Sequence, residues 1–227
     1  MQYITLLFRK HKKHLPKKLQ STWFGELCRF GFMIFLSAWI LQGIRIMNWR
    51  EATLKVALTV IPTAILIMFG VHFILAFIIA HTLNFALNGQ LYAMYTHMGA
   101  TNVTPQHFLE ITELFAQTCA TKSYLNAAIA YGSLSRGCFK STSDIDLRLI
   151  PQKGELNWWK CVLFAFGLRI ISFLKGYPLD LYVYDPTVVV KRMRTDELPI
   201  MLYERDGYMK EWYAERVEHN EFIGIFT

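Results

Sequence analysis

Hydrophobic residues follow two different patterns along this chain, and the change from one to the other divides the chain into two regions. Two long apolar runs come first, Phe30 to Ile44 and Val56 to Ala80, and neither contains a formally charged residue. From about residue 100 onward, apolar positions instead recur at helical spacing or alternate with polar ones. The pattern therefore predicts a membrane region followed by a separate folded domain that contains both helices and strands.

The second run is the stronger candidate for a membrane span. Its twenty-five residues exceed the about 20 that a helix needs to cross the hydrocarbon core. The first run has only fifteen, although Arg29 and Arg45 at its ends could extend its reach by snorkelling. We predict a transmembrane helical hairpin with spans at about 29–46 and 55–81. A re-entrant first segment and a single span are the alternatives.

The later pattern predicts the elements of an α/β domain. Thr104 and Pro105 begin a helix, because threonine suits the N-cap and proline the first helical position. Predicted strands cover Asn126–Tyr131, Ser143–Ile150 and Tyr177–Asp185, and a crossover helix covers residues 155–175. That helix is apolar nearly all round, so it is expected to be buried, with a third membrane span as the competing interpretation.

Composition supports a membrane location and argues against a nucleic-acid platform. The chain is 53% hydrophobic and only 18% charged, against about 25% charged residues in ordinary soluble domains. Its net charge of +7 comes largely from six basic residues among the first eighteen. The remaining 18 basic residues face 17 acidic ones, a net charge of +1. An extended track of nucleic acid is therefore not an expected partner, whereas anionic lipid suits the basic end.

Candidate chemistry is concentrated between residues 129 and 182. Gly132 and Ser133 follow the first predicted strand, and a helix starting there would direct backbone N–H groups at a phosphate. Ten residues later, Asp144 and Asp146 alternate with apolar residues and so project from the same face of one strand, together with Arg148. Two carboxylates about 7 Å apart repel each other, which favours a bound cation such as Mg²⁺. A third carboxylate, Asp180, lies in the next predicted strand.

This combination resembles the nucleotidyltransferase superfamily of DNA polymerase beta-like enzymes. The shared features are an apolar residue before Gly-Ser, the Asp-x-Asp pair, and a later Asp between apolar residues. The resemblance covers roughly residues 105–190. It implies an α/β (α+β) fold of the minimal nucleotidyltransferase type, a mixed sheet flanked by helices. We accordingly divide the chain into a basic cytoplasmic tail (1–27), a membrane helical region (28–99), a catalytic domain (100–190) and a C-terminal extension (191–227).

The resemblance also implies a mechanism. Asp144, Asp146 and Asp180 would bind two Mg²⁺ or Mn²⁺ ions and transfer a nucleoside monophosphate from an NTP donor, releasing pyrophosphate. Asp180 would also help to deprotonate the acceptor hydroxyl. Gly132, Ser133, Arg136 and Lys140 would contact the triphosphate, by the chemistry of these residue types beside the motif.

Location adds an expectation about the acceptor and the partners. An enzyme anchored in the bilayer suits a hydroxyl or phosphate acceptor that is lipid-linked or glycan-related. The positive-inside rule and the cytoplasmic pool of NTPs both place the catalytic domain on the cytoplasmic side of the membrane. The membrane helices also offer surfaces for homo- or hetero-oligomers. The alternative function is a non-catalytic subunit of a membrane complex that uses the same fold to bind a nucleotide or a partner.

Overall fold

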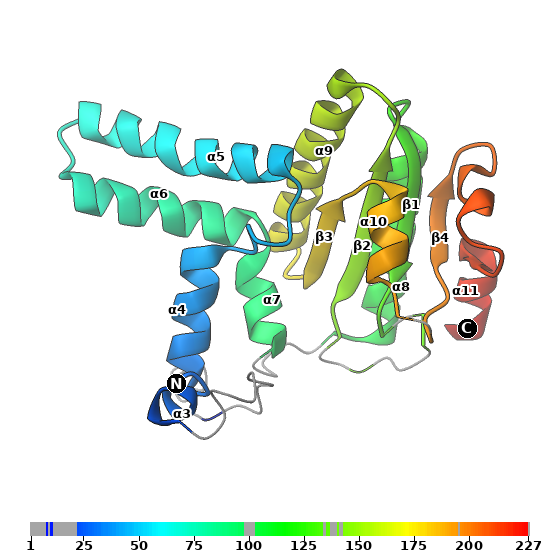
Figure 1. The fold of residues 1–227 in the computed structure, drawn as a ribbon, viewed down its shortest axis with the longest axis horizontal. Coiled ribbons are helices and arrows are strands. Elements are labelled where there is room, and N and C mark those ends of the chain that lie inside the picture. The colour runs from blue at the N-terminus through cyan, green and yellow to red at the C-terminus, as the bar shows by residue number, and fades with distance from the viewer. Residues whose placement is uncertain are drawn as a thin grey trace.

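The computed structural model describes residues 22–97, 103–133, 143–194 and 196–226, together with positions 8, 10, 135, 136 and 140. Most of the predicted basic tail therefore lies outside the described residues. The described part is a mixed α/β fold with a sheet flanked by helices and an apolar helical arm (Figure 1).

A five-stranded mixed sheet forms the centre of the domain. Its strands are β1 (Leu125–Tyr131), β2 (Ile145–Pro151), β3 (Leu179–Val183), β4 (Ile200–Glu204) and β5 (Val217–Glu218), in the order β3-β2-β1-β4-β5. Strands β2 and β3 are parallel, as are β4 and β5, whereas β1 is antiparallel to both of its neighbours. The three strands that the sequence predicts are thus confirmed, and they are adjacent in the sheet.

Helices cover both faces of this sheet. On one face, α8 (Pro105–Ala120) and α9 (Glu155–Leu174) bury the main core, which includes Phe108, Phe115 and Leu147. On the other face, α10 (Pro186–Arg192) packs over Ile129 and Tyr182. Figure 1 shows α10 in front of the sheet and α8 behind it.

Local sequence signals account for the ends of these elements. The Thr104 side chain accepts a hydrogen bond from the His107 backbone N–H at 3.2 Å, which confirms it as the N-cap of α8. Helix α9 connects β2 to the parallel strand β3, as a crossover helix must. Asp185 ends the β3 region and caps α10, and Pro186 takes the first position of that helix.

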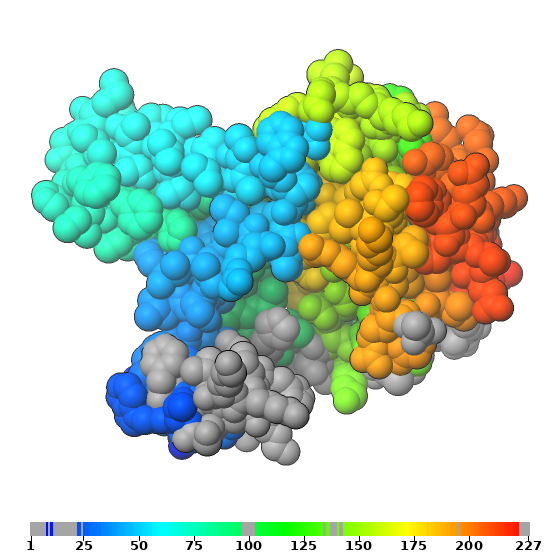
Figure 2. All heavy atoms as spheres, in the orientation of Figure 1, coloured from blue at the N-terminus to red at the C-terminus, as the bar shows by residue number. Residues whose placement is uncertain are grey.

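The membrane region differs from its prediction. The run predicted as one span at 55–81 is two helices, α5 (Trp49–Met68) and α6 (Phe73–Leu87), which turn back on each other between Phe69 and His72. Gly70 lies in that turn with a positive φ of 83°. Pro62 remains inside α5. Figure 2 shows the pair as an arm that stands out from the body of the protein.

Small and polar side chains hold the two helices of this hairpin together. Ala76 and Ala80 are buried on α6, and Thr59 and Thr63 are buried on α5. Asn84 donates hydrogen bonds of 2.8 Å to the Lys55 carbonyl and to the Thr59 hydroxyl. Small residues allow close approach and internal hydrogen bonds satisfy the polar groups, as in helix pairs that are surrounded by lipid.

The outer surfaces of the hairpin are exposed and apolar. They carry large hydrophobic side chains on both helices, namely Val56, Val60, Ile61, Ile65, Phe73, Ile74, Leu75, Ile78 and Leu83. Helix α5 has 20 residues, about 30 Å at about 1.5 Å per residue, and its first turns, with Glu51 and Lys55, are buried at the base of the hairpin. Among the described residues, two helices, α5 and α9, meet the length and composition of a membrane span.

The first apolar run also differs from its predicted span at about 29–46. Its helix, α4 (Gly31–Leu41), has only 11 residues, and Figure 1 shows it extending away from the base of the hairpin, transverse to α5 and α6. Trp39 at its end donates a hydrogen bond of 3.2 Å to Thr82 on α6 and packs edge-on against His81. Beyond α6, the chain bends by 66° into α7 (Gln90–His97). The 11 residues of α4 are too few to cross a bilayer.

The base of the hairpin is fixed to the edge strand β3. Glu51 is buried, accepts a hydrogen bond from Val183 N–H at 3.0 Å, and pairs with Arg169 of α9 at 2.5 Å. The Asn48 side chain donates to the Val183 carbonyl at 2.7 Å. These side chains satisfy the backbone of a strand that would otherwise present an open edge. The base of the hairpin is therefore attached directly to the sheet through β3.

The C-terminal extension packs on the opposite edge. It contains the 3₁₀ turn η1 (Tyr208–Glu211). The final segment is helix α11 (His219–Phe226). Phe222 of α11 is buried in the main core, which explains why this segment is ordered against β4.

Candidate active site

The structure brings the three predicted carboxylates to one face and one end of the sheet. Asp146 of β2 and Asp180 of β3 are direct neighbours in the parallel register. Asp144 immediately precedes β2 and has the same parity as Asp146. The side chains of Asp146 and Asp180 are 23% and 26% exposed, so a ligand can reach both.

Gly132 lies directly against this carboxylate cluster. It follows β1 with φ of 83°, and a Cβ added there would lie 2.0 Å from Oδ2 of Asp146. No other residue type fits that distance, and L residues other than glycine are strained at this φ. The Gly-Ser motif and the Asp-x-Asp motif, which are separated in the sequence, are therefore in contact across β1 and β2.

The helix predicted at Gly132-Ser133 is not found in the described residues of this stretch. Gly132, Ser133, Ser135 and Arg136 lie in turns. A set of N–H groups presented by a helix terminus therefore cannot be assigned to these residues. The reason is that Gly132 adopts positive φ immediately after the strand, which diverts the chain from a direct strand-to-helix transition.

The predicted triphosphate contacts have three different environments. The Ser133 hydroxyl is buried and has no hydrogen-bond partner among the described residues. Arg136 forms an ion pair with Glu197, in the segment before β4. Lys140 is exposed, and its backbone N–H donates to the Ser143 hydroxyl at 3.0 Å. The Ser133 hydroxyl is therefore able to donate a hydrogen bond to a bound ligand.

A cation already sits beside the carboxylates. Arg148, two residues after Asp146 on the same face, donates from Nη2 to Oδ2 of Asp180 at 2.9 Å, and the same nitrogen lies 3.7 Å from Oδ1 of Asp146. Its guanidinium stacks near the rings of Tyr131 and Tyr182, at 4.7 and 4.9 Å from their centroids. The alternating pattern placed Arg148 on this face, but its partner on β3 was not visible in the sequence.

Burial has the largest effect on the electrostatics of this cluster. Together with the nearby charges of Asp144 and Asp180, it raises the pKa of the Asp146 carboxyl to about 8, although Arg148 acts in the opposite direction. A bound divalent cation would favour the ionised carboxylate and lower this pKa again.

The donor set fits a hard divalent ion at Asp144 and Asp146, with carboxylate oxygens of the kind that Mg²⁺ prefers. The full set of three fits less well. Within the described ranges, no three His, Cys, Asp or Glu side chains are arranged to hold one ion. Asp180 has one oxygen engaged by Arg148. The tyrosines around Arg148 are the part of the site that sequence reasoning missed, and alternation along β1 and β3 was the signal that could have found them.

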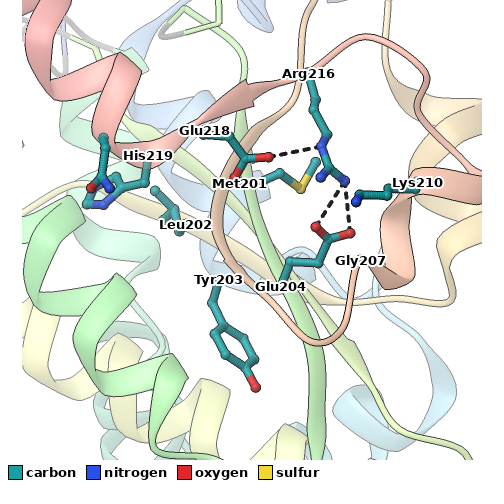
Figure 3. Close-up of a pocket in the computed structure, with 10 residues that line it drawn as sticks. Met201, Leu202, Tyr203, Glu204, Gly207, Lys210, Arg216, Glu218 and His219 are labelled. Carbon is teal, nitrogen blue, oxygen red and sulfur yellow. Dashed lines mark hydrogen bonds and ion pairs between the residues drawn. The ribbon is translucent and has the colours of Figure 1, made fainter.

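A hollow lies at the far edge of the sheet, between β4, β5, η1 and α11 (Figure 3). Its volume is about 370 Å³. Arg216 within it pairs with both Glu204 and Glu218, at 2.9 and 3.0 Å. None of the residues predicted for catalysis or nucleotide binding lines this hollow. We therefore place the candidate active site at the carboxylates and not at this hollow.

No known family model matches this chain, and no curated protein matches it in sequence. The function of this protein is therefore inferred from the geometry of the site.

Proposed function

We propose that this protein is a membrane-inserted nucleotidyltransferase that moves a nucleoside monophosphate from an NTP to an acceptor oxygen. The observation that carries the proposal is the contact between Gly132 and the carboxylate of Asp146, with Asp180 next to it in register. That contact unites the two halves of the motif that resembles polymerase beta-like enzymes. The clustered carboxylates provide the reason for a cation to bind, and the bound cation would in turn attract a triphosphate.

The reaction assigns a task to each group. The acceptor oxygen attacks the α-phosphorus, a new P–O bond forms, the α–β bridging P–O bond breaks and pyrophosphate leaves. Asp180 takes the proton of the acceptor hydroxyl. The Ser133 hydroxyl donates to a phosphate oxygen, and Gly132 lets the phosphate chain approach the backbone closely. Asp144 and Asp146 hold the metal, which when bound shields the charge of the triphosphate and stabilises the charge that develops during transfer.

The hairpin supports a definite membrane topology. Both of its ends join the catalytic domain, and its tip at 69–72 has no charged residue. Arg45, Arg50 and Lys55 lie at the base of the hairpin, beside the domain. The basic residues and the domain are then on one side, which the positive-inside rule makes the cytoplasmic side.

The site also lies close to the membrane base, which favours a membrane-linked acceptor. Tyr182 on β3 and Tyr184, the residue just after that strand, contact the linker between α4 and α5. A Cβ at Gly43 would lie 3.1 Å from the Tyr182 hydroxyl, and the Tyr184 hydroxyl donates to the Ile46 carbonyl. An acceptor carried by a lipid would arrive along this surface. A lipid-linked hydroxyl or phosphate is therefore the proposed acceptor class.

The direct test is binding and turnover of each of the four NTPs by detergent-purified protein, with and without Mg²⁺. We expect one NTP to bind in a metal-dependent manner and to release pyrophosphate when membrane lipid extract is supplied. Asp144→Asn and Asp146→Asn should abolish both signals. Turnover unchanged in these variants would refute the proposal. Metal-dependent binding without pyrophosphate release under any acceptor mixture would favour a nucleotide-binding subunit.

Topology is tested separately with a cysteine at the tip. Val71→Cys should react with a membrane-impermeant maleimide added outside intact cells, in a background with the native cysteines replaced. A cysteine at Leu163, on the exposed surface of α9, should react only after the cells are opened. Labelling of both positions from outside would contradict the assigned topology.

A further inference from the structure

Arg148 is held more firmly than a surface cation. Its side chain is only 8% exposed. Nη1 donates to the backbone carbonyls of Asp180 and Leu147 at 2.6 and 2.9 Å, and Nη2 donates to the Asp180 carboxylate. The stacked tyrosines on β1 and β3 enclose the guanidinium plane. An arginine with this many fixed bonds cannot leave without breaking the packing around it.

This arrangement changes what Asp180 can do. Arg148 is charged at all relevant pH values, and it takes a position within 4 Å of two of the three carboxylates. When all three carboxylates are ionised, the guanidinium offsets one of their negative charges, and it does so at Asp180, where the ion pair is 2.9 Å long. The nearer carboxylate to Arg148 is Asp180, so the remaining ion belongs at Asp144 and Asp146.

We propose that Arg148 is a built-in cation that replaces the second metal ion, so that this site holds one divalent ion, on Asp144 and Asp146, with Asp180 as the partner of Arg148. This inference rests on the proposed nucleotidyl transfer and replaces the pair of ions that the family resemblance implies. Arg148 acts as a positioning residue: it orients Asp180 toward the acceptor and keeps that carboxylate from ligating metal.

The experiment counts Mn²⁺ ions bound to nucleotide-free, detergent-purified full-length protein by electron paramagnetic resonance. Every variant is measured at the same pH and ionic strength. Wild type should bind one Mn²⁺ per chain. Asp180→Asn should still bind one, because Asp180 does not ligate the metal, while its transferase activity is lost. Asp146→Asn should weaken binding by at least about tenfold, as removal of a supporting ligand does.

Asp185→Asn is the matched control, since it lies on the same chain segment outside the site and asparagine also serves as an N-cap. It should change neither the ion count nor the affinity. Arg148→Gln, with folding verified by its thermal transition, should admit a second Mn²⁺. If this variant does not fold, the comparison between Asp180→Asn and wild type decides.

The outcomes separate this inference from the proposed function. Two ions in the wild type, with one lost in Asp180→Asn, would overturn the role of Arg148 and leave the transferase intact. A folded Arg148→Gln that still binds one ion would also overturn it. Absence of Mn²⁺ binding in wild type would remove the metal site altogether, and with it both proposals.

Discussion

At the scale of single residues, the site depends on a glycine that no other residue can replace. In Gly132→Ala, the new methyl group would meet Oδ2 of Asp146 at 2.0 Å and the residue would be strained at positive φ. We expect a loss of more than about 1 kcal/mol of stability and of nucleotidyl transfer. Thermal denaturation and pyrophosphate release measure the two effects.

Gly70→Ala is the matched control for this substitution. Gly70 has the same φ of 83°, but nothing lies within 4 Å of a Cβ built there. This variant bears the backbone strain without the clash, so its transfer activity should match that of wild type. Equal activity losses in both variants would show that strain, and not the contact with Asp146, explains the effect.

A second residue-scale prediction concerns pH. In the metal-free protein the pKa of Asp146 is raised from 3.8 to about 8, mainly by burial. The folded state therefore binds a proton that the unfolded state releases, so stability should fall as the pH rises from about 4 to about 8 and level off above that. Melting temperatures measured in the presence of a chelator test this dependence.

Asp146→Asn should remove that decline, because asparagine does not titrate. Its melting temperature should exceed that of wild type at about pH 8, while the two converge at about pH 4. Asp185→Asn should retain the wild-type slope. Parallel curves for Asp146→Asn and wild type would contradict the raised pKa of the Asp146 carboxyl.

At the scale of elements, the junction between the hairpin and the sheet depends on a buried ion pair. Glu51→Ala leaves Arg169 buried without its carboxylate and Val183 N–H without an acceptor. We expect a loss of about 3–5 kcal/mol, measured by chemical denaturation in detergent. Glu155→Ala breaks the exposed pair with Arg50 and should have little effect. Similar losses in the two variants would argue against a specific junction at β3.

The elements themselves show which sequence signals were sufficient. Capping at Thr104 and alternation around Asp146 depend on neighbours within a few residues, and both predictions were confirmed. The turn at Gly70 was missed because an uncharged run of twenty-five residues gives the same hydropathy whether it is straight or folded back. The signal that could have revealed the turn was the placement of Thr59, Thr63 and Asn84, polar residues that face one another only in an antiparallel pair.

At the scale of the whole molecule, the arm and the body should respond differently to charge. Ile78 on α6 and Leu163 on α9 are both exposed, at 44% and 55%. Ile78→Asp would place a carboxylate in the hydrocarbon at a cost of about 2.5–3.5 kcal/mol, so the protein should be released from membranes by mild salt or alkaline washing. Leu163→Asp should remain bound.

This comparison also decides the role of α9, which has the length and composition of a span. Its buried side chains, among them Cys161, Val162, Leu168 and Arg169, pack toward the sheet and the hairpin base. A helix committed to the sheet on one side cannot be surrounded by lipid. If Leu163→Asp released the protein as readily as Ile78→Asp, α9 would have to contact the membrane.

Residue type and local period were enough to predict strands β1, β2 and β3, the N-cap of α8, the apolar character of the arm and the set of three carboxylates, because each of these depends on neighbouring residues. Strands β4 and β5 were not predicted, and three further features became visible only in the fold: the turn at Gly70, the contact of Glu51 with the β3 edge, and the pairing of Arg148 with Asp180. Each joins residues that are distant in the chain or on different strands. Strand register and helix packing bring these residues together, and a local sequence pattern reports neither of them.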